Sequence, residues 1–133
     1  MRGAKLVLVI GAGVVLSGVA AQAVLAEDYG PFKEQKTKLG NLLVSPTGMT
    51  LYTFDKDTPG ISACTGSCAE RWPPAAATAA DQPAGDLTII KRPDGSLQWA
   101  DSGKPLYLYQ DDHKPGDVAG DGKGGVWHVV KEQ

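Results

Sequence analysis

The feature that most constrains this chain is an internal repeat, in which one short motif occurs twice, 55 residues apart. Residues 48–57 read GMTLYTFDKD, and residues 103–112 read GKPLYLYQDD. Each copy is followed by a Pro-Gly pair and then by a tryptophan: Pro59-Gly60 and Trp72, Pro115-Gly116 and Trp127. Copies this short cannot each close a hydrophobic core, so we expect the two copies, near residues 48–72 and 103–127, to pack against each other.

The pattern between and around the motifs predicts short antiparallel strands. Apolar or alternating runs occupy residues 42–44, 51–54, 87–90, 97–99, 106–109 and 126–130. Gly, Pro, Ser and Asp separate these runs, which is typical of hairpins. Residues 64–72 are the one stretch expected to hold a helical turn, which Pro73-Pro74 would end. The Ala-rich stretch 75–84 is expected to be a mobile surface connection. The predicted fold is therefore all-β: a small single domain of antiparallel strands built from two related repeats, with a short helical turn near the cysteines.

The N-terminus has the three-part pattern of a secretory signal peptide. Arg2 and Lys5 form a basic start, residues 6–21 carry no charge, and Val24-Leu25-Ala26 offers a cleavage site. We expect cleavage after Ala26, with Ala23 as a second site. An uncleaved anchor is the alternative, but the stretch is rich in glycine and broken by polar residues, whereas a spanning helix needs about 20 strongly apolar residues. No stable membrane span is expected after cleavage.

The chain is thus divided into a signal peptide (1–26), a polar N-terminal arm (27–39) and a two-repeat β domain (40–133). The whole chain has a net charge of −2, and losing the two basic residues of the signal makes the remainder more acidic. No basic run follows residue 26. This balance argues against nucleic acid as a partner, because nucleic acid rewards clustered Lys and Arg.

The motif residues together resemble a known bacterial family. The paired elements Y-x-[FWY]-x-x-D, the following Pro-Gly, the segment from Cys64 to Trp72 and the closing Gly125-Val126-Trp127-His128 are similar to the bacterial secreted repeat of unknown function. That family is also described as predicted lipoproteins with a Yx(FWY)xxD motif. The resemblance implies the fold type and an extracytoplasmic address, and no activity. No cysteine lies near the cleavage site for lipid attachment, so we expect a periplasmic or secreted protein.

The cysteines Cys64 and Cys68 are the only two in the chain, and they leave two readings open. An exported chain with an even cysteine count usually oxidises its cysteines, and positions four apart on a helical turn lie about 6 Å apart, within disulfide reach. We therefore expect a disulfide and no cofactor. The alternative is a copper-binding or thiol-redox protein, because soft thiolates favour Cu(I). The candidate ligands for that site are Cys64, Cys68, His113, His128 and Met49.

The repeated polar and aromatic residues have a structural interpretation. Asp57 and Asp112 are expected to accept backbone N–H bonds in the turns after their strands. In each motif the aromatic residues are spaced by two and so share one face of a strand, which we expect to be the core. The aromatic set is Tyr52, Phe54, Trp72, Tyr107, Tyr109 and Trp127.

No arrangement of residues in the sequence indicates catalysis or an EF-hand. We therefore expect a non-enzymatic extracytoplasmic module that binds an unknown ligand or an envelope protein.

Overall fold

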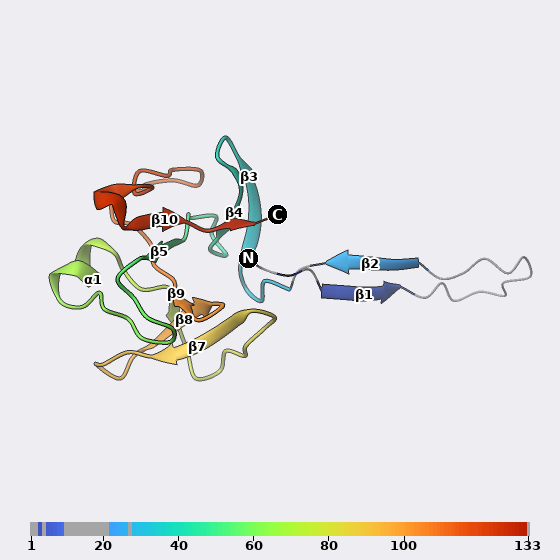
Figure 1. Cartoon of the computed structure of the whole chain (residues 1–133), viewed down its shortest axis with the longest axis horizontal. Coiled ribbons are helices and arrows are strands. Elements are labelled where there is room, and N and C mark those ends of the chain that lie inside the picture. Colours follow the sequence, from blue (N-terminus) through green and yellow to red (C-terminus); the bar gives the residue numbers. More distant parts are fainter. Residues whose placement is uncertain (1–2, 4, 10–21, 27, 133) are drawn as a thin grey trace, which may run out of the picture.

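The structure is a computed structural model that describes residues 3, 5–9, 22–26 and 28–132. Strands β1 (Lys5–Val9) and β2 (Gln22–Ala26) form an antiparallel pair that extends away from the rest of the chain in Figure 1. Most of the apolar stretch of the expected signal peptide, residues 10–21, lies outside the described residues, and cleavage stays a prediction. No helix in the described part of the chain is long and apolar enough to cross a membrane.

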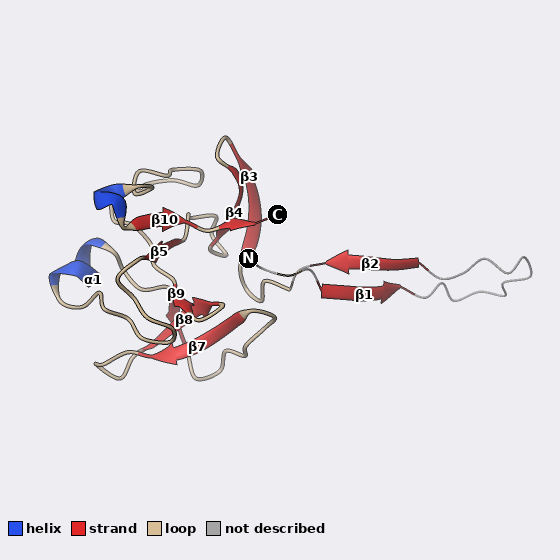
Figure 2. Ribbon diagram, in the orientation of Figure 1, coloured by secondary structure: helices blue, strands red, loops and turns tan. Residues whose placement is uncertain are grey.

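The regular secondary structure of residues 28–132 consists almost entirely of short antiparallel strands, which are joined by long loops and turns (Figure 2). One sheet has the order β11-β4-β3, with the bounds Lys131–Glu132, Gly40–Val44 and Lys33–Thr37. A second has the order β6-β8-β7 with β9 beside β8, and the bounds are Ala76–Ala77, Leu97–Asp101, Leu87–Lys91 and Lys104–Pro105. A separate pair joins β5 (Tyr52–Phe54) to β10 (Trp127–Val129). The predicted all-β class is confirmed.

The two sheets are equivalent under the repeat, and each is completed by a strand from the other repeat. The β3–β4 hairpin of the first repeat receives β11 from the end of the second repeat. The β7–β8 hairpin of the second repeat receives β6 from the end of the first. The backbone bond from Leu43 N to Val130 O, 2.9 Å long, has its counterpart from Trp99 N to Ala75 O, also 2.9 Å. The repeats therefore exchange their last strands.

The two motifs meet at the centre of this arrangement, where Tyr52 of β5 forms an isolated antiparallel bridge with Tyr107. Residues 106–109, which the sequence predicted to be a strand, contain only isolated bridges at Tyr107, and the strand of that motif is the short β9. Tyr52 N donates to Tyr107 O at 2.8 Å, and Tyr107 N donates to Tyr52 O at 2.9 Å. An approximate two-fold axis thus passes between these two residues and relates one repeat to the other. Two apolar clusters fill the interior around it, and both contain residues of both repeats. The first consists of Leu42, Val44, Tyr52, Cys64, Trp72, Tyr107, Tyr109, Trp127 and Val129. The second consists of Phe32, Leu43, Leu51, Ala75, Leu87, Trp99 and Leu106.

The two repeats differ mainly in the loops that follow the motifs. The first repeat has the short helix α1 (Ser67–Arg71), which lies within the stretch where the sequence predicts a helical turn. The second repeat has a single 3₁₀ turn, η1 (Lys123–Gly125), which the sequence did not indicate. The connection between β8 and β9 is a tight two-residue turn, and its central residues Ser102 and Gly103 both have positive φ (52° and 83°). Such a turn matches the twist of the flanking strands.

Two segments that the sequence analysis set apart carry strands. Within the expected arm 27–39, β3 pairs along its whole length with β4. The sequence did not predict β3, because it is an edge strand whose side chains are polar and mostly exposed. Polar and charged side chains are common on edge strands, where they hinder pairing with other chains. Within the Ala-rich stretch, β6 pairs with β8 and Ala75 is buried. Small side chains gave that strand no hydrophobic alternation to detect.

Candidate functional site at the junction of the two repeats

The tyrosine of each motif is hydrogen-bonded to the aspartate of the other motif. The Tyr52 hydroxyl donates to Asp112 Oδ2 at 2.6 Å, and the Tyr107 hydroxyl donates to Asp57 Oδ2 at 2.7 Å. Both tyrosines are fully buried, and burial raises the pKa of each hydroxyl well above its usual value. The tyrosines therefore act as neutral donors. The tyrosine and the aspartate that bond to each other come from different repeats, so the motif residues link the two repeats.

The second carboxylate oxygen of each aspartate accepts a backbone N–H from the loop that follows its own motif. Asp57 Oδ1 accepts the N–H of Ala63 at 2.6 Å, and Asp112 Oδ1 accepts the N–H of Ala119 at 2.8 Å. These are the backbone bonds that the sequence analysis expected of the two aspartates. Burial is the main cause of a raised pKa in both carboxyls, although the bonds that they accept act in the opposite direction.

The surroundings of the two aspartates differ because the second repeat supplies a buried arginine on one side. Arg92 is 6% exposed, and its guanidinium donates to Ser62 Oγ at 3.0 Å and to the Cys64 carbonyl at 2.7 Å. Ser62 Oγ in turn lies 2.6 Å from the Tyr107 hydroxyl. The positive charge lowers the pKa of Asp57 in part, whereas the charges that act on Asp112 are those of other aspartates and raise its pKa.

Arg92 was not a sequence candidate. The sequence indicated only a turn at residues 92–95, which the structure contains as the bond from Gly95 N to Arg92 O. An arginine in a turn is normally solvated, and nothing local in the sequence shows that this side chain points inward.

The motif aromatics form a stack of four rings that crosses the two-fold axis. Trp72 and Trp127 lie face to face, with ring centroids 3.8 Å apart and an interplanar angle of 2°. Phe54 stacks on the outer face of Trp127 at 4.1 Å, and Tyr109 stacks on Trp72 at 4.1 Å. The stack is therefore symmetric in order: each tryptophan is covered by the second aromatic residue of the other motif.

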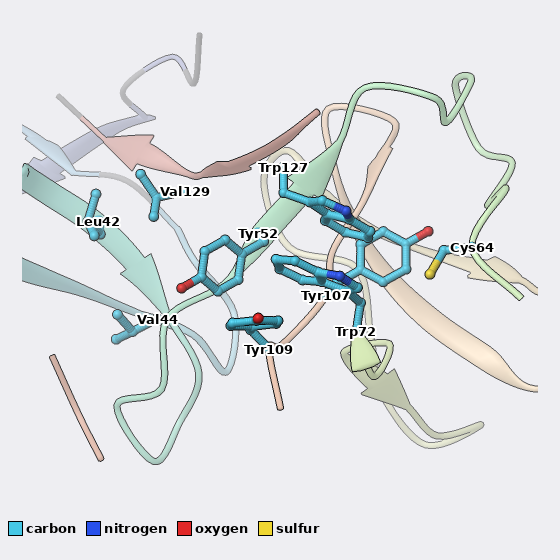
Figure 3. Close-up of a cluster of buried hydrophobic side chains, with 9 residues drawn as sticks. All are labelled: Leu42, Val44, Tyr52, Cys64, Trp72, Tyr107, Tyr109, Trp127 and Val129. Atoms are coloured by element: carbon cyan, nitrogen blue, oxygen red, sulfur yellow. The ribbon is translucent and has the colours of Figure 1, made fainter. Parts of the chain in front are cut away.

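The first tyrosine of each motif meets this stack by its edge. Tyr52 contacts Trp72 with centroids 5.3 Å apart, and Tyr107 contacts Trp127 at 5.2 Å. Figure 3 shows the two tyrosines on opposite sides of the tryptophan pair. Edge and stacked contacts of this kind are both favourable arrangements of aromatic rings. The expectation that the motif aromatics build the core agrees with the packing, but Phe54 is only partly buried.

Glycine and proline also brace one repeat against the other. A Cβ added to Gly48 would lie 3.2 Å from the Pro115 side chain, and one added to Gly103 would lie 3.6 Å from that of Pro59. Gly60 N further donates to Gly103 O at 2.8 Å. The glycine that opens each motif thus faces the proline that follows the other motif.

Cys64 and Cys68 are joined in a disulfide with a Cα–Cα distance of 5.2 Å, which confirms the expected pairing. The bond closes the loop that begins α1, and Trp72 N donates to Cys68 O at 2.8 Å directly after the helix. The disulfide therefore fixes the turn that presents Trp72 to the stack.

The other candidate copper ligands have different neighbours. His128 Nε2 lies 2.8 Å from Asp55 Oδ2, and both side chains are about half exposed. His113 is exposed in the loop after the second motif. Met49 lies in the turn closed by the bond from Ser45 N to Met49 O. In the described part of the chain, no group of three or more His, Cys, Asp or Glu side chains is arranged to hold a metal ion.

An open trough lies on the surface where the two repeats meet. It consists of two adjoining hollows of about 340 and 170 Å³, and three residues line both: Thr53, Ser102 and Lys104. The larger hollow is also lined by Phe54, Asp55 and Asp57, and by the prolines Pro59 and Pro105. The smaller hollow continues along residues 129–132. No local sequence pattern indicates the trough, because its walls come from three distant segments, residues 53–59, 101–105 and 129–132.

The two ends of the aromatic stack differ in exposure. Phe54 lines the trough, whereas the equivalent Tyr109 is 8% exposed and has the Lys123 ammonium 5.6 Å from its ring centroid. Gly120 lets the backbone pack against the Tyr109 end of the stack, since a Cβ at this position would lie 2.6 Å from the Trp72 ring. One end of the stack thus faces solvent beside polar groups, and the other end is covered.

Comparison with known proteins supports the repeat assignment. A family model described as a secreted repeat of unknown function matches residues 34–76 and 88–131. The first match begins in β3 and ends in β6, and the second begins in β7 and ends in β11. Each match therefore contains the hairpin of one repeat and the last strand, which that repeat contributes to the sheet of the other. No curated protein and no solved structure matches the chain.

Proposed function

The chain belongs to the family of secreted repeats of unknown function, and from that premise we propose that it is an extracytoplasmic, non-enzymatic module that binds a saccharide of the cell envelope in the trough at the repeat junction. The observation that carries the proposal is that the partly buried Phe54 lines the trough beside residues that bear hydroxyl, carboxylate and ammonium groups. An apolar ring face accepts the C–H face of a sugar, and nearby hydroxyl, carboxylate and ammonium groups bond its hydroxyls.

The polar groups around Phe54 suit a saccharide better than an apolar ligand. Thr53 and Ser102 supply hydroxyls that donate and accept, Asp55 accepts, and Lys104 donates. Both signs of charge are present, so the trough has no strong preference for a charged polymer. Its two hollows share Thr53, Ser102 and Lys104, so together they offer room for more than one sugar unit.

A binding role also accords with how the motif is used. The polar groups of Tyr52, Tyr107, Asp57 and Asp112 bond to one another or to backbone N–H groups. Catalysis by an acid or a base requires a group within reach of substrate, and these groups are engaged in holding the two repeats together.

The copper-binding or thiol-redox alternative depends on reduction of the disulfide. The thiolate is the form of cysteine that binds metal, and a disulfide sulfur is a poor ligand. A Cu(I) site on Cys64 and Cys68 would therefore require that both cysteines persist as thiols in the envelope, with His113, His128 or Met49 brought to them.

Two pairs of variants test the saccharide proposal on the full chain. Phe54→Leu removes the aromatic face from the trough, and Tyr109→Phe changes the equivalent ring at the covered end of the stack. Lys104→Ala removes an ammonium from the trough, and Lys91→Ala removes one from β7, away from the trough. Binding is measured by calorimetry and by pull-down with purified peptidoglycan and with soluble fragments of its glycan.

We expect Phe54→Leu and Lys104→Ala to weaken binding by about tenfold each, as loss of about 1.4 kcal/mol implies. Tyr109→Phe and Lys91→Ala should bind as the parent protein does. Equal binding by all four variants, or no binding by the parent protein to any envelope glycan, would exclude the proposed site. Tight Cu(I) binding by freshly isolated protein with free thiols would instead favour the alternative.

A further inference from the structure

We propose that the stacked tryptophan pair and the Tyr52–Asp112 pair together form a buried trap for an oxidising equivalent delivered by a small oxygen-derived radical. This activity is separate from the proposed saccharide binding, because it uses the interior stack rather than the trough. The radical takes one electron from Trp72 and Trp127, Tyr52 then returns an electron to the tryptophans, and its proton moves to Asp112.

The tryptophan pair is suited to lose an electron. Trp72 and Trp127 have centroids 3.8 Å apart and nearly parallel planes, so a positive charge left on one ring is shared with the other. Phe54 and Tyr109 extend the stack on its two faces at 4.1 Å each. Both tryptophans are 5% exposed, so the charge is held inside the protein but close to its surface.

Tyr52 is placed to fill the vacancy. Its ring contacts Trp72 by an edge at 5.3 Å, and its hydroxyl donates to Asp112 Oδ2 at 2.6 Å. A tyrosine that gives up an electron must also release its phenolic proton, and a carboxylate at this distance receives it along an existing hydrogen bond. The balance is complete: the radical leaves as its anion, the tryptophans return to neutral, and the protein holds a neutral tyrosyl radical beside a protonated Asp112.

The equivalent Tyr107–Asp57 pair is the poorer acceptor. Its carboxylate feels the buried charge of Arg92, which disfavours a bound proton. The Tyr107 hydroxyl also shares Ser62 Oγ with that guanidinium. Within residues 28–132, the hydrogen-bonding partners of the Asp112 carboxyl are Tyr52 and the Ala119 N–H, and no arginine or lysine of that range bonds to it. The asymmetry selects Tyr52 over Tyr107 as the final site of the radical.

Pulse radiolysis of the full chain tests this order of events. Azide radicals oxidise tryptophan first, and transient absorption follows the decay of the tryptophan radical and the rise of the tyrosyl radical. We expect Tyr52→Phe to abolish most of the rise, whereas Tyr107→Phe retains it. Asp112→Asn should slow the rise by about a hundredfold, the usual contribution of a positioned proton acceptor. Trp99→Phe, which alters a tryptophan that packs on Phe32 instead, should leave the kinetics unchanged.

A second measurement needs no variant and guards against loss of folding. The rise in the parent protein should be slower in deuterium oxide, because a proton moves with the electron. Absence of this isotope effect would overturn the proposal. It would also be overturned by a rise that persists in folded Tyr52→Phe, or by one that is lost equally in Tyr107→Phe.

Discussion

At the scale of single residues, Asp57 and Asp112 occupy equivalent positions but differ in the charges around them. Both bond the tyrosine of the other motif and one backbone N–H of their own loop. Arg92 favours the ionised form of Asp57, whereas Asp111 and Asp117 disfavour that of Asp112. Ionised Asp112 is therefore the less well compensated of the two, and it is only 7% exposed.

This difference predicts a pH dependence of stability. The pKa of Asp112 is raised in the folded state, so between its ordinary value and the raised value the folded chain binds more protons than the unfolded chain. The free energy of unfolding should then fall as pH rises through that window. Asp57, whose pKa is also raised, acts in the same sense, whereas Asp94 and Asp117, whose pKa values are lowered, act in the opposite sense. Urea unfolding at several pH values should show a smaller decline with rising pH in Asp112→Asn than in the parent protein; equal slopes would contradict the assignment.

Gly120 gives a second residue-scale prediction. A methyl group there would lie 2.6 Å from the Trp72 ring and 3.0 Å from the Tyr109 ring, so Gly120→Ala must displace the covered end of the stack. We expect a loss of about 1–3 kcal/mol in the free energy of unfolding. Ala119→Ser alters the exposed neighbouring side chain and should change stability by less than about 0.5 kcal/mol. Equal stability of the two variants would mean that Trp72 and Tyr109 can shift to accommodate the added methyl group without a measurable cost, and would contradict the prediction.

At the scale of elements, the helix α1 is too short to be stable by itself, and its neighbours define it. Five residues lie far below the length at which an isolated helix persists. The disulfide closes its first turn, and the Arg92 guanidinium bonds the Cys64 carbonyl at 2.7 Å. The element is thus held by a covalent bond and by a buried charge from the other repeat.

Removal of the disulfide should therefore have a measurable but limited effect. For so short a loop, the chain-entropy model gives about 2 kcal/mol of stabilisation. The variant with Cys64→Ser and Cys68→Ser should lose about this much and keep its strand content by circular dichroism. Thiol labelling of freshly isolated protein should find no free cysteine. Free thiols together with a one-to-one Cu(I) complex, lost on changing either cysteine, would reverse this prediction.

The elements also show what the sequence can and cannot reveal. Hydrophobic alternation predicted β7, β8 and β10, and Pro73-Pro74 indicated where α1 must end. The same signal fails for β3 and β6, because one is polar throughout and the other consists of two alanines. The repeat predicted that two copies pack together. Which strands they exchange, and that Tyr52 reaches Asp112 rather than Asp57, depends on long-range pairing that a local pattern does not contain.

At the scale of the whole molecule, three kinds of contact made by the motif cross between the repeats. The last strand of each repeat completes the sheet of the other, each tyrosine bonds the opposite aspartate, and each opening glycine faces the opposite proline. The tryptophan pair lies on the axis that relates them. A single repeat would therefore expose half of both apolar clusters and leave two buried polar groups without partners.

This arrangement predicts that the repeats fold only together. Two fragments, residues 28–81 and 84–132, separate at an exposed loop and cut no strand. Each fragment alone should be largely unfolded by circular dichroism, because chains of about 50 residues bury little surface and the Cys64–Cys68 disulfide of the first fragment closes only a short local loop. Mixing the two should restore strand signal and a cooperative melt, since all the cross-repeat contacts can form between separate chains. Fragments carrying Asp57→Ala and Asp112→Ala should complement poorly, because each leaves a buried tyrosine hydroxyl without its acceptor at a cost of about 1–3 kcal/mol. Cooperative unfolding of either fragment by itself would show that one repeat suffices, and the exchange of strands would then be an addition to a stable unit rather than the condition for its folding.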